Sequence, residues 1–120
     1  MRMRGVRGAV QVTANTAESI GAGVQELIQA MMRSNSLTPA DVISVIFTSS
    51  PDLTAAFPAA ACREMGFESV PLIGAVEVDV PGALDKTIRV MMHCTTSLTP
   101  DKISHIYLHG AQSLRRDIAQ

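Results

Sequence analysis

The chain has 120 residues, of which 47% are apolar and 18% charged, and its formal net charge is −1. This length predicts one domain over residues 1–120, and the balanced charge without a basic run excludes the electrostatic footprint of a nucleic-acid-binding protein. No segment approaches the roughly 20 apolar residues of a membrane span, and the first residues lack the apolar stretch of a signal peptide. The two cysteines lie far apart and indicate no disulfide framework, so we expect a cytoplasmic protein without membrane contact.

The first elements along the chain are an extended segment at residues 2–12 and a long amphipathic helix. Gly5 and Gly8 give the strand no side chain to pack at these positions, which predicts a bulge or a close backbone approach. Asn15–Thr16 supplies residue types that cap a helix, and Glu18 lies in the first turn, where the helix dipole favours a carboxylate. Apolar residues then recur at helical spacing: Ile20, Val24, Leu27, Ile28, Met31 and Met32.

The remaining elements are four strands and a short helix. Strands are predicted at residues 42–48, 72–78, 87–95 and 104–109, and the helix at Pro58–Met65, ended by Gly66. Thr38–Pro39 and Thr99–Pro100 repeat one capping pattern ahead of the first and last of these strands. The order strand, helix, strand, helix and three strands predicts an α/β (α+β) fold, a sheet with its helices on one face.

An arginine lies in the middle of the otherwise apolar strand at residues 87–95. Alternation predicts one face made of Ile88, Val90, Met92 and Cys94, and the other made of Thr87, Arg89, Met91 and His93. A charged group in such a strand is costly unless it is paired. Arg89 therefore has either an internal or interface carboxylate partner or an anionic ligand, and the sequence leaves both readings open.

Two more strands carry a charge within an apolar run. Arg7 lies between Val6 and Gly8, and Glu77 follows the predicted alternation of Ala75, Glu77 and Asp79 against Val76, Val78 and Val80. If these strands are neighbours of the Arg89 strand, two arginines and a glutamate converge on one pocket. Paired guanidinium groups predict a ligand with carboxylate or phosphate groups. Tyr107 either completes this clamp or is a core residue with a satisfied hydroxyl.

Other chemistries match the sequence less well. His93, Cys94, His105 and His109 have no spacing typical of a zinc site. The chain contains no nucleophile elbow, P-loop or dinucleotide fingerprint, and Cys62 in an alanine-rich helix is expected to pack rather than react. We expect no metal, no cofactor and a reaction that needs no pair of nucleophile and base.

The ordered motifs of the chain resemble those of one family, the monofunctional AroH-type chorismate mutases. The segments that carry the resemblance are Arg4–Ala9, Pro51–Leu53, Phe57–Ala59, Arg63–Glu64, Glu77–Val80, Ile88–Met92, Ile106–Leu108 and Leu114–Arg115. They cover almost the whole chain in unbroken order, and their joint order and spacing are more specific than any one of them.

The resemblance implies a fold, an assembly and a reaction. The fold is a mixed sheet packed on one long and one or two short helices, and three subunits form a pseudo-barrel homotrimer with active sites between adjacent chains. The reaction is the rearrangement of chorismate to prephenate, without a cofactor. By resemblance, Arg7 and Arg89 bind substrate carboxylates and Arg89 also reaches the ether oxygen, Tyr107 binds a carboxylate and Glu77 the ring hydroxyl.

The resemblance also implies a set of substrate-binding residues around this centre: Phe57, Ala59, Arg63, Ile73, Gly74, Leu114 and Arg115. Among these, Phe57 and Arg63 come from the neighbouring subunit, and the segment with Leu114 closes the pocket. Some family members have a lysine at Ala60, a threonine at Ile73 and a cysteine at Gly74. The lost lysine removes a peripheral charge, so these departures bear on affinity more than on the reaction.

Two other functions remain as alternatives on the sequence. One is an imine or enamine deaminase of related trimeric fold, which also holds a carboxylate with an interface arginine. The other is a trimeric anion-binding or structural module whose arginines only pair with Glu77 and Asp79. The spacing of Glu77, Arg89 and Tyr107 favours the mutase.

Overall fold

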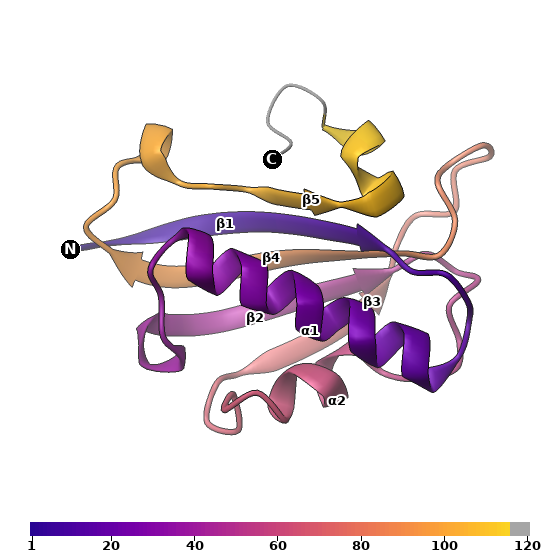
Figure 1. Cartoon of the computed structure of the whole chain (residues 1–120), viewed down its shortest axis with the longest axis horizontal. Helices are drawn as coiled ribbons and strands as arrows, with labels where there is room; N and C mark the ends of the chain where they lie inside the picture. Colours follow the sequence, from indigo (N-terminus) through magenta and orange to yellow (C-terminus); the bar gives the residue numbers. More distant parts are fainter. Residues whose placement is uncertain (116–120) are drawn as a thin grey trace.

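The computed structural model describes residues 1–115. The chain folds into a five-stranded mixed sheet with helices on one face (Figure 1). The strands are β1 (Arg2–Gln11), β2 (Val42–Ser49), β3 (Leu72–Val76), β4 (Thr87–Thr96) and β5 (Ile106–Leu108). The helices are α1 (Ala17–Ser34) and α2 (Pro58–Arg63), with 3₁₀ turns η1 (Pro39–Asp41), η2 (Pro100–Lys102) and η3 (His109–Leu114). The predicted fold class, with one long and one short α-helix on the sheet, is confirmed.

The strand order β3-β2-β4-β1-β5 puts β4 at the centre of the sheet. β4 runs antiparallel to both β1 and β2, whereas β3 is parallel to β2 and β5 is parallel to β1. The strands of Arg7 and Arg89 are therefore direct neighbours, and β5 brings Tyr107 beside β1. Glu77 comes directly after β3, on the other side of β2.

The core lies between α1 and the inner face of the sheet. The Thr16 side chain caps α1 by accepting a hydrogen bond from the Ser19 N–H at 3.1 Å, as predicted. At Gly8 an added Cβ would lie 2.5 Å from Sδ of the buried Met31, so the predicted close approach is between strand and helix. β1 pairs with β4 without interruption, and the irregularity lies instead in β2, between Val42 and Ser44.

Alternation along the strands separates the two faces of the sheet. The inner face contributes buried residues to the core: Val6, Val10, Val45, Phe47, Ile88, Val90, Met92 and Cys94. The predicted alternation of β4 is confirmed, since Arg89 and Met91 are exposed on the opposite face. None of the helices within residues 1–115 combines the length and apolar character required to cross a membrane.

Three predicted elements are shorter in the structure: the strands at residues 72–78 and 104–109 and the helix at Pro58–Met65. β3 ends at Val76, and Val78 and Val80 are exposed in a bend where the Val80 N–H donates to the Val78 carbonyl, so their alternation is not that of a strand. β5 begins only at Ile106, after the predicted start at Ser104, and it ends before His109, whose φ of 57° begins η3. α2 is likewise shorter than predicted and ends at Arg63.

Candidate active site

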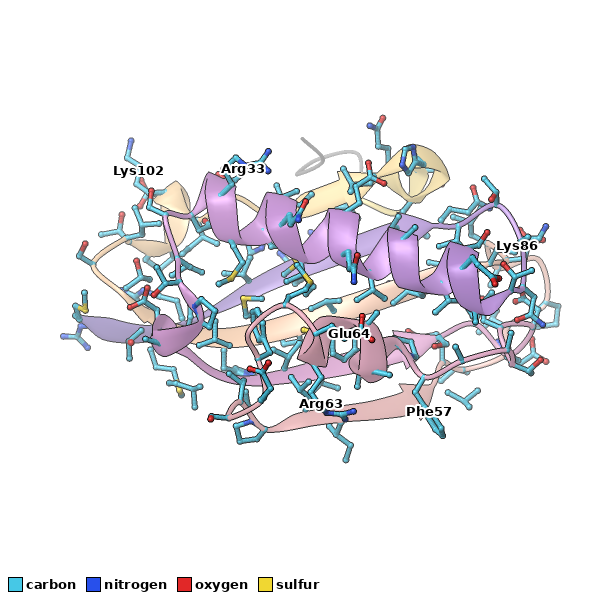
Figure 2. All side chains as sticks on the ribbon, turned by 60° about the horizontal axis from the view of Figure 1, so that its bottom comes forward. Arg33, Phe57, Arg63, Glu64, Lys86 and Lys102 are labelled. Atoms are coloured by element: carbon cyan, nitrogen blue, oxygen red, sulfur yellow. The ribbon has the colours of Figure 1, made fainter. Side chains whose placement is uncertain are left out.

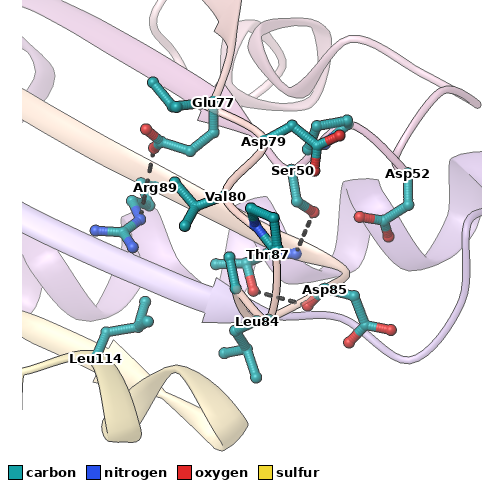
Figure 3. Close-up of a pocket in the computed structure, with 15 residues that line it drawn as sticks. Ser50, Asp52, Glu77, Asp79, Val80, Leu84, Asp85, Thr87, Arg89 and Leu114 are labelled. Carbon is teal, nitrogen blue, oxygen red and sulfur yellow. Dashed lines mark hydrogen bonds and ion pairs between the residues drawn. The ribbon is translucent and has the colours of Figure 1, made fainter.

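Arg89 lies on the outer face of the central strand, directly opposite Ala9 of β1 and Thr48 of β2. Its Nε lies 3.5 Å from Oε1 of Glu77, and a dashed line marks this ion pair in Figure 3. The internal carboxylate partner that the sequence left open is therefore present. However, 46% of the Arg89 side chain and 37% of the Glu77 side chain are exposed, so the pair remains accessible to a ligand.

Two hollows meet at Arg89. The larger has a volume of about 460 Å³ and includes Glu77, the loop at residues 78–85, the turn at residues 50–52, and Leu114 (Figure 3). The smaller has a volume of about 200 Å³ and is lined by Arg7, Gly8, Ile46, Thr48, Arg89, Val90, Met91 and Tyr107. The four residues predicted as catalytic, Arg7, Glu77, Arg89 and Tyr107, thus line one or both of the two hollows that share Arg89.

Tyr107 and Leu114 belong to a C-terminal segment that folds over the outer face of the sheet. Tyr107 is buried, and it packs with Ala9 of β1 and Ala111 of η3, with Leu114 against this cluster. The lone tyrosine is therefore largely a packed residue whose ring also borders the smaller hollow. The packing is that of a core residue, and the contribution of Tyr107 to an anion clamp stays a prediction.

The backbone of Arg7 is held by a histidine. The Arg7 N–H donates to Nδ1 of His105 at 2.9 Å, just before β5 begins to pair with β1. Burial lowers the pKa of His105, and the positive charges of Arg7 and Arg115 lower it further. The ring is therefore neutral near pH 7, with its proton on Nε2 and Nδ1 free to accept.

Hydrogen bonds fix both ends of the loop between β3 and β4. The Glu77 N–H donates to the Ser49 carbonyl at 2.9 Å, so Glu77 is placed where β3 leaves the ladder. At the other end, Ser50 Oγ accepts from the Thr87 N–H at 2.9 Å and Asp52 accepts from the Lys86 N–H at 2.9 Å. The part of the larger hollow that this loop forms is therefore held in place by hydrogen bonds at both ends.

The remaining predicted site residues do not join this centre within one chain. Phe57 is 82% exposed and Arg63 is also exposed; both lie with α2 toward the β3 edge of the sheet (Figure 2). Ile73 and Gly74 are exposed on β3, and Ala59 is a buried residue of α2. None of the five lines either hollow. These residues thus lie toward the β3 edge of the sheet, whereas Tyr107, which lines the smaller hollow, lies on β5 at the other edge.

The histidines and cysteines have separate surroundings. His93 contacts Ser44 Oγ at 3.2 Å and His109 pairs with Glu26 at 3.0 Å. Within residues 1–115, no group of three or more histidine, cysteine, aspartate or glutamate side chains is placed to hold a metal ion. Cys62 is buried, and burial raises the pKa of its thiol to about 12, so it is a packing residue rather than a nucleophile.

The sequence reading missed Thr48. Its hydroxyl donates to Oε1 of Glu77 at 2.8 Å, the same oxygen that faces Arg89. The available indication was a polar, β-branched residue at the end of an apolar strand. Which charged residue lay beside it depended on the strand order, which the sequence did not provide.

Comparison with known proteins gives the family. The family profile described as chorismate mutase type I matches residues 3–118. The chain belongs to the type I chorismate mutase family. It is 42% identical to a chorismate mutase AroH from Thermus thermophilus over 117 residues, which cover 97% of this chain and 96% of that protein. It is 40% identical to the chorismate mutase AroH of Bacillus subtilis over 120 residues, covering 99% and 94%.

A solved structure supports the same assignment. A chorismate mutase from Clostridium thermocellum matches with a TM-score of 0.90 and 48% sequence identity, covering 92% of this chain and 98% of that one. The predicted resemblance to AroH-type chorismate mutases is confirmed. Full-length matches at this identity place the chain in an isomerase family and disfavour the deaminase and the purely structural module.

Proposed function

We propose that this protein is a chorismate mutase, which converts chorismate to prephenate in the biosynthesis of phenylalanine and tyrosine. The observation that carries the proposal is Arg89, a half-exposed guanidinium group at the junction of two hollows, within a chain of the type I family. Its Nε faces Glu77, and its terminal amino groups have no partner among residues 1–115. They are therefore available to an anionic substrate.

The chemistry requires few protein groups. The rearrangement is pericyclic, so one ether C–O bond breaks while a C–C bond forms, with no proton transfer and no covalent intermediate. Charge builds on the ether oxygen, and the enolpyruvyl side chain must fold over the ring. The protein has to restrain this conformation and hold a fixed positive charge beside the developing oxyanion. Arg89 supplies that charge.

The other residues around Arg89 restrain the substrate. We assign the substrate carboxylates to Arg7, Arg89 and Tyr107, because these side chains border the smaller hollow. Glu77 accepts a hydrogen bond from the ring hydroxyl with the oxygen that Thr48 and Arg89 leave free. Leu114 and Arg115 cover the substrate from the C-terminal segment, since Leu114 borders the larger hollow beside Arg89.

A second copy of the chain completes the site in this proposal, within a homotrimer. Phe57 and Arg63 would reach the substrate of the neighbouring subunit, together with Ala59, Ile73 and Gly74. Two observations support this assembly. Phe57 is an almost fully exposed aromatic side chain, and apolar residues are exposed on the outer face and at the β3 edge of the sheet: Ile43, Ile46, Ile73, Val76 and Met91.

We also infer that the enzyme acts in the cytoplasm. Cys62 and Cys94 are both free and buried, which is typical of a protein from a reducing compartment. Fractionation of the source cells tests this inference. Recovery of the protein from a periplasmic or membrane fraction would contradict it.

The activity is tested by following the loss of chorismate's ultraviolet absorbance with purified protein, and by identifying prephenate as the product. Arg89→Ala, assayed in parallel, is expected to lose about 2.7–4 kcal/mol of transition-state stabilisation, largely in kcat, because one oxyanion donor is removed. No turnover by the unaltered protein contradicts the proposed function. Near-normal turnover by Arg89→Ala contradicts the role of Arg89.

The shared site is tested with mixed trimers. Arg89→Ala and Arg63→Ala chains, each impaired alone, are co-expressed with different tags and purified through both tags. In a cyclic trimer that contains both chains, one site receives Arg89 and Arg63 from unaltered copies, so about one third of the wild-type sites are restored. A mixed trimer without recovered activity would show that Arg63 does not act across the interface.

A further inference from the structure

Thr48 lies on the outer face of the sheet near the end of β2, between two residues of the neighbouring strands. It pairs with Ala75 of β3 on one side and with Arg89 of β4 on the other. Residues directly opposite each other in a ladder point to the same face. The Thr48 side chain therefore lies on the face of the proposed active site, next to Arg89. Glu77 follows two residues after Ala75, the partner of Thr48 on β3.

The hydroxyl of Thr48 and the guanidinium of Arg89 converge on a single oxygen atom. Thr48 Oγ1 donates to Oε1 of Glu77 at 2.8 Å, and Nε of Arg89 lies 3.5 Å from the same Oε1. The second carboxylate oxygen, Oε2, has no partner among residues 1–115. Of the two carboxylate oxygens, one is therefore fixed by the protein, and the other is left as an acceptor.

The Glu77 side chain needs such a fixed point, because the hydrogen bond that holds its backbone does not orient its carboxylate. Glu77 follows the last residue of β3 and keeps only one ladder-like hydrogen bond, from its N–H to the Ser49 carbonyl. A glutamate side chain also loses considerable rotamer entropy when it is held in one conformation. Thr48, in contrast, is a β-branched residue with restricted χ1 on a regular strand. It can orient Glu77 at low entropic cost.

The same contact bears on Arg89. The Nε edge of its guanidinium faces Glu77, so the direction of the Glu77 carboxylate decides where the terminal amino groups point. A planar guanidinium with one edge fixed presents its remaining donors in a defined plane. A carboxylate free to rotate would loosen both groups together.

We propose that Thr48 is a positioning residue, whose hydroxyl holds Glu77 so that one carboxylate oxygen meets a substrate hydroxyl and the other fixes Arg89. The inference rests on the proposed function, because the substrate hydroxyl is the ring hydroxyl of chorismate. It adds a residue to the reaction that works through Glu77 rather than by touching the substrate.

Two substitutions at Thr48 separate the hydroxyl from the shape of the side chain. Thr48→Val keeps the β-branched shape and removes the donor, whereas Thr48→Ser keeps the donor and removes a methyl group. We expect kcat/KM to fall about tenfold in Thr48→Val, the size of one hydrogen bond to a charged group. Thr48→Ser should retain most of the wild-type kcat/KM. Equal losses in both variants, or none in Thr48→Val, would overturn the proposal.

A double-mutant cycle shows whether Thr48 acts through Glu77. In a Glu77→Ala background the hydroxyl has nothing to orient, so Thr48→Val should cause no further loss of kcat/KM. A tenfold loss in that background as well would mean that Thr48 contacts the substrate itself, and would overturn the positioning role. Circular dichroism melting of all variants serves as the control for folding.

A structural measurement keeps this inference separate from the activity. If the wild-type protein does not convert chorismate, the proposed function fails, while crystal structures of wild type and Thr48→Val still test the contact. The expected result is a rotated or doubly placed Glu77 carboxylate in Thr48→Val. An unchanged Glu77 side chain would overturn the positioning role.

Discussion

The two faces of the sheet are built from the same strands and have opposite properties. On β4, Met92 is fully buried under α1, whereas its neighbour Met91 is 37% exposed on the other face. On β2, Phe47 is buried and Thr48 borders a hollow. The inner face is covered within the chain by the helices. On much of the outer face, charged and apolar side chains lie together, exposed and uncovered by any element within residues 1–115.

This difference indicates that ligand binding and assembly are located on the outer face. A covered face needs only apolar side chains of suitable volume, since burial supplies the stability. An open face that combines a half-exposed arginine with exposed apolar residues needs a ligand, another copy of the chain, or both.

The largest expected effect is that of Arg89→Lys, on the open face. An ammonium group retains the charge but not the planar fork, so one edge can no longer face Glu77 while the other faces the substrate. We expect kcat to fall roughly a hundredfold or more, in the range of one lost oxyanion donor. Steady-state kinetics on chorismate measure this loss. Turnover within a few-fold of wild type would mean that charge alone is sufficient.

The adjacent methionines of β4 give the sharpest test of the two faces. Met92→Ala is expected to lower the free energy of unfolding by about 2–3 kcal/mol, because it opens a cavity in the core. Met91→Ala should leave the chain folded and weaken the assembly. Its melting temperature should therefore match that of the wild type at high protein concentration and fall below it when both proteins are diluted. Thermal melts over a range of protein concentrations measure both effects. A concentration-independent loss in Met91→Ala would contradict the assembly on this face.

A smaller effect is expected at the β3 edge. Phe57→Ala should raise KM about tenfold, because an exposed aromatic side chain that serves the neighbouring subunit's site contributes contact rather than folding stability. Phe57→Leu is the matched control and should recover most of the affinity. A large fall in the melting temperature without a change in KM would show that Phe57 is a structural residue of its own chain.

The smallest effect concerns pH, at the junction of β1 and β5. His105 has a folded-state pKa below the ordinary value of 6.5, so the unfolded chain takes up the proton first as the pH falls. The stability contributed by the neutral ring is therefore complete above pH 6.5 and is lost as the pH falls below it toward the folded-state pKa. The cations that face the ring, Arg7 from β1 and Arg115 after η3, act in the same direction.

Denaturant unfolding of wild type and His105→Asn between pH 7.5 and about pH 5 measures this effect. An asparagine side-chain oxygen can accept the Arg7 N–H but does not titrate. We expect the difference in unfolding free energy between the two proteins to shift in favour of His105→Asn as the pH falls. A difference that is constant with pH would contradict the assigned role of the His105 ring.

The order and type of the helices and strands, the separation of faces on β4 and the family were all predictable from the residues alone. α1 was predictable because helical periodicity extends over its whole length, and the Thr16 cap marks its start. The alternation of β4 was predictable because buried and exposed positions follow the pleat. Local pattern was less reliable at strand ends, where Val78 and Val80 continue an apolar alternation after the β3 ladder has ended.

Which charged residues meet depends on the strand order, and the residue pattern did not predict that order. The strand order puts Arg89 between β1 and β2, and that neighbourhood depends on pairing between residues far apart in the chain. The role of the Thr48 hydroxyl could not be predicted from the sequence, because its partner Glu77 is distant in the chain and follows a different strand. Local propensities act over a few residues, whereas a site is made by long-range pairing of strands, so the residue types could be read from the sequence and their convergence could not.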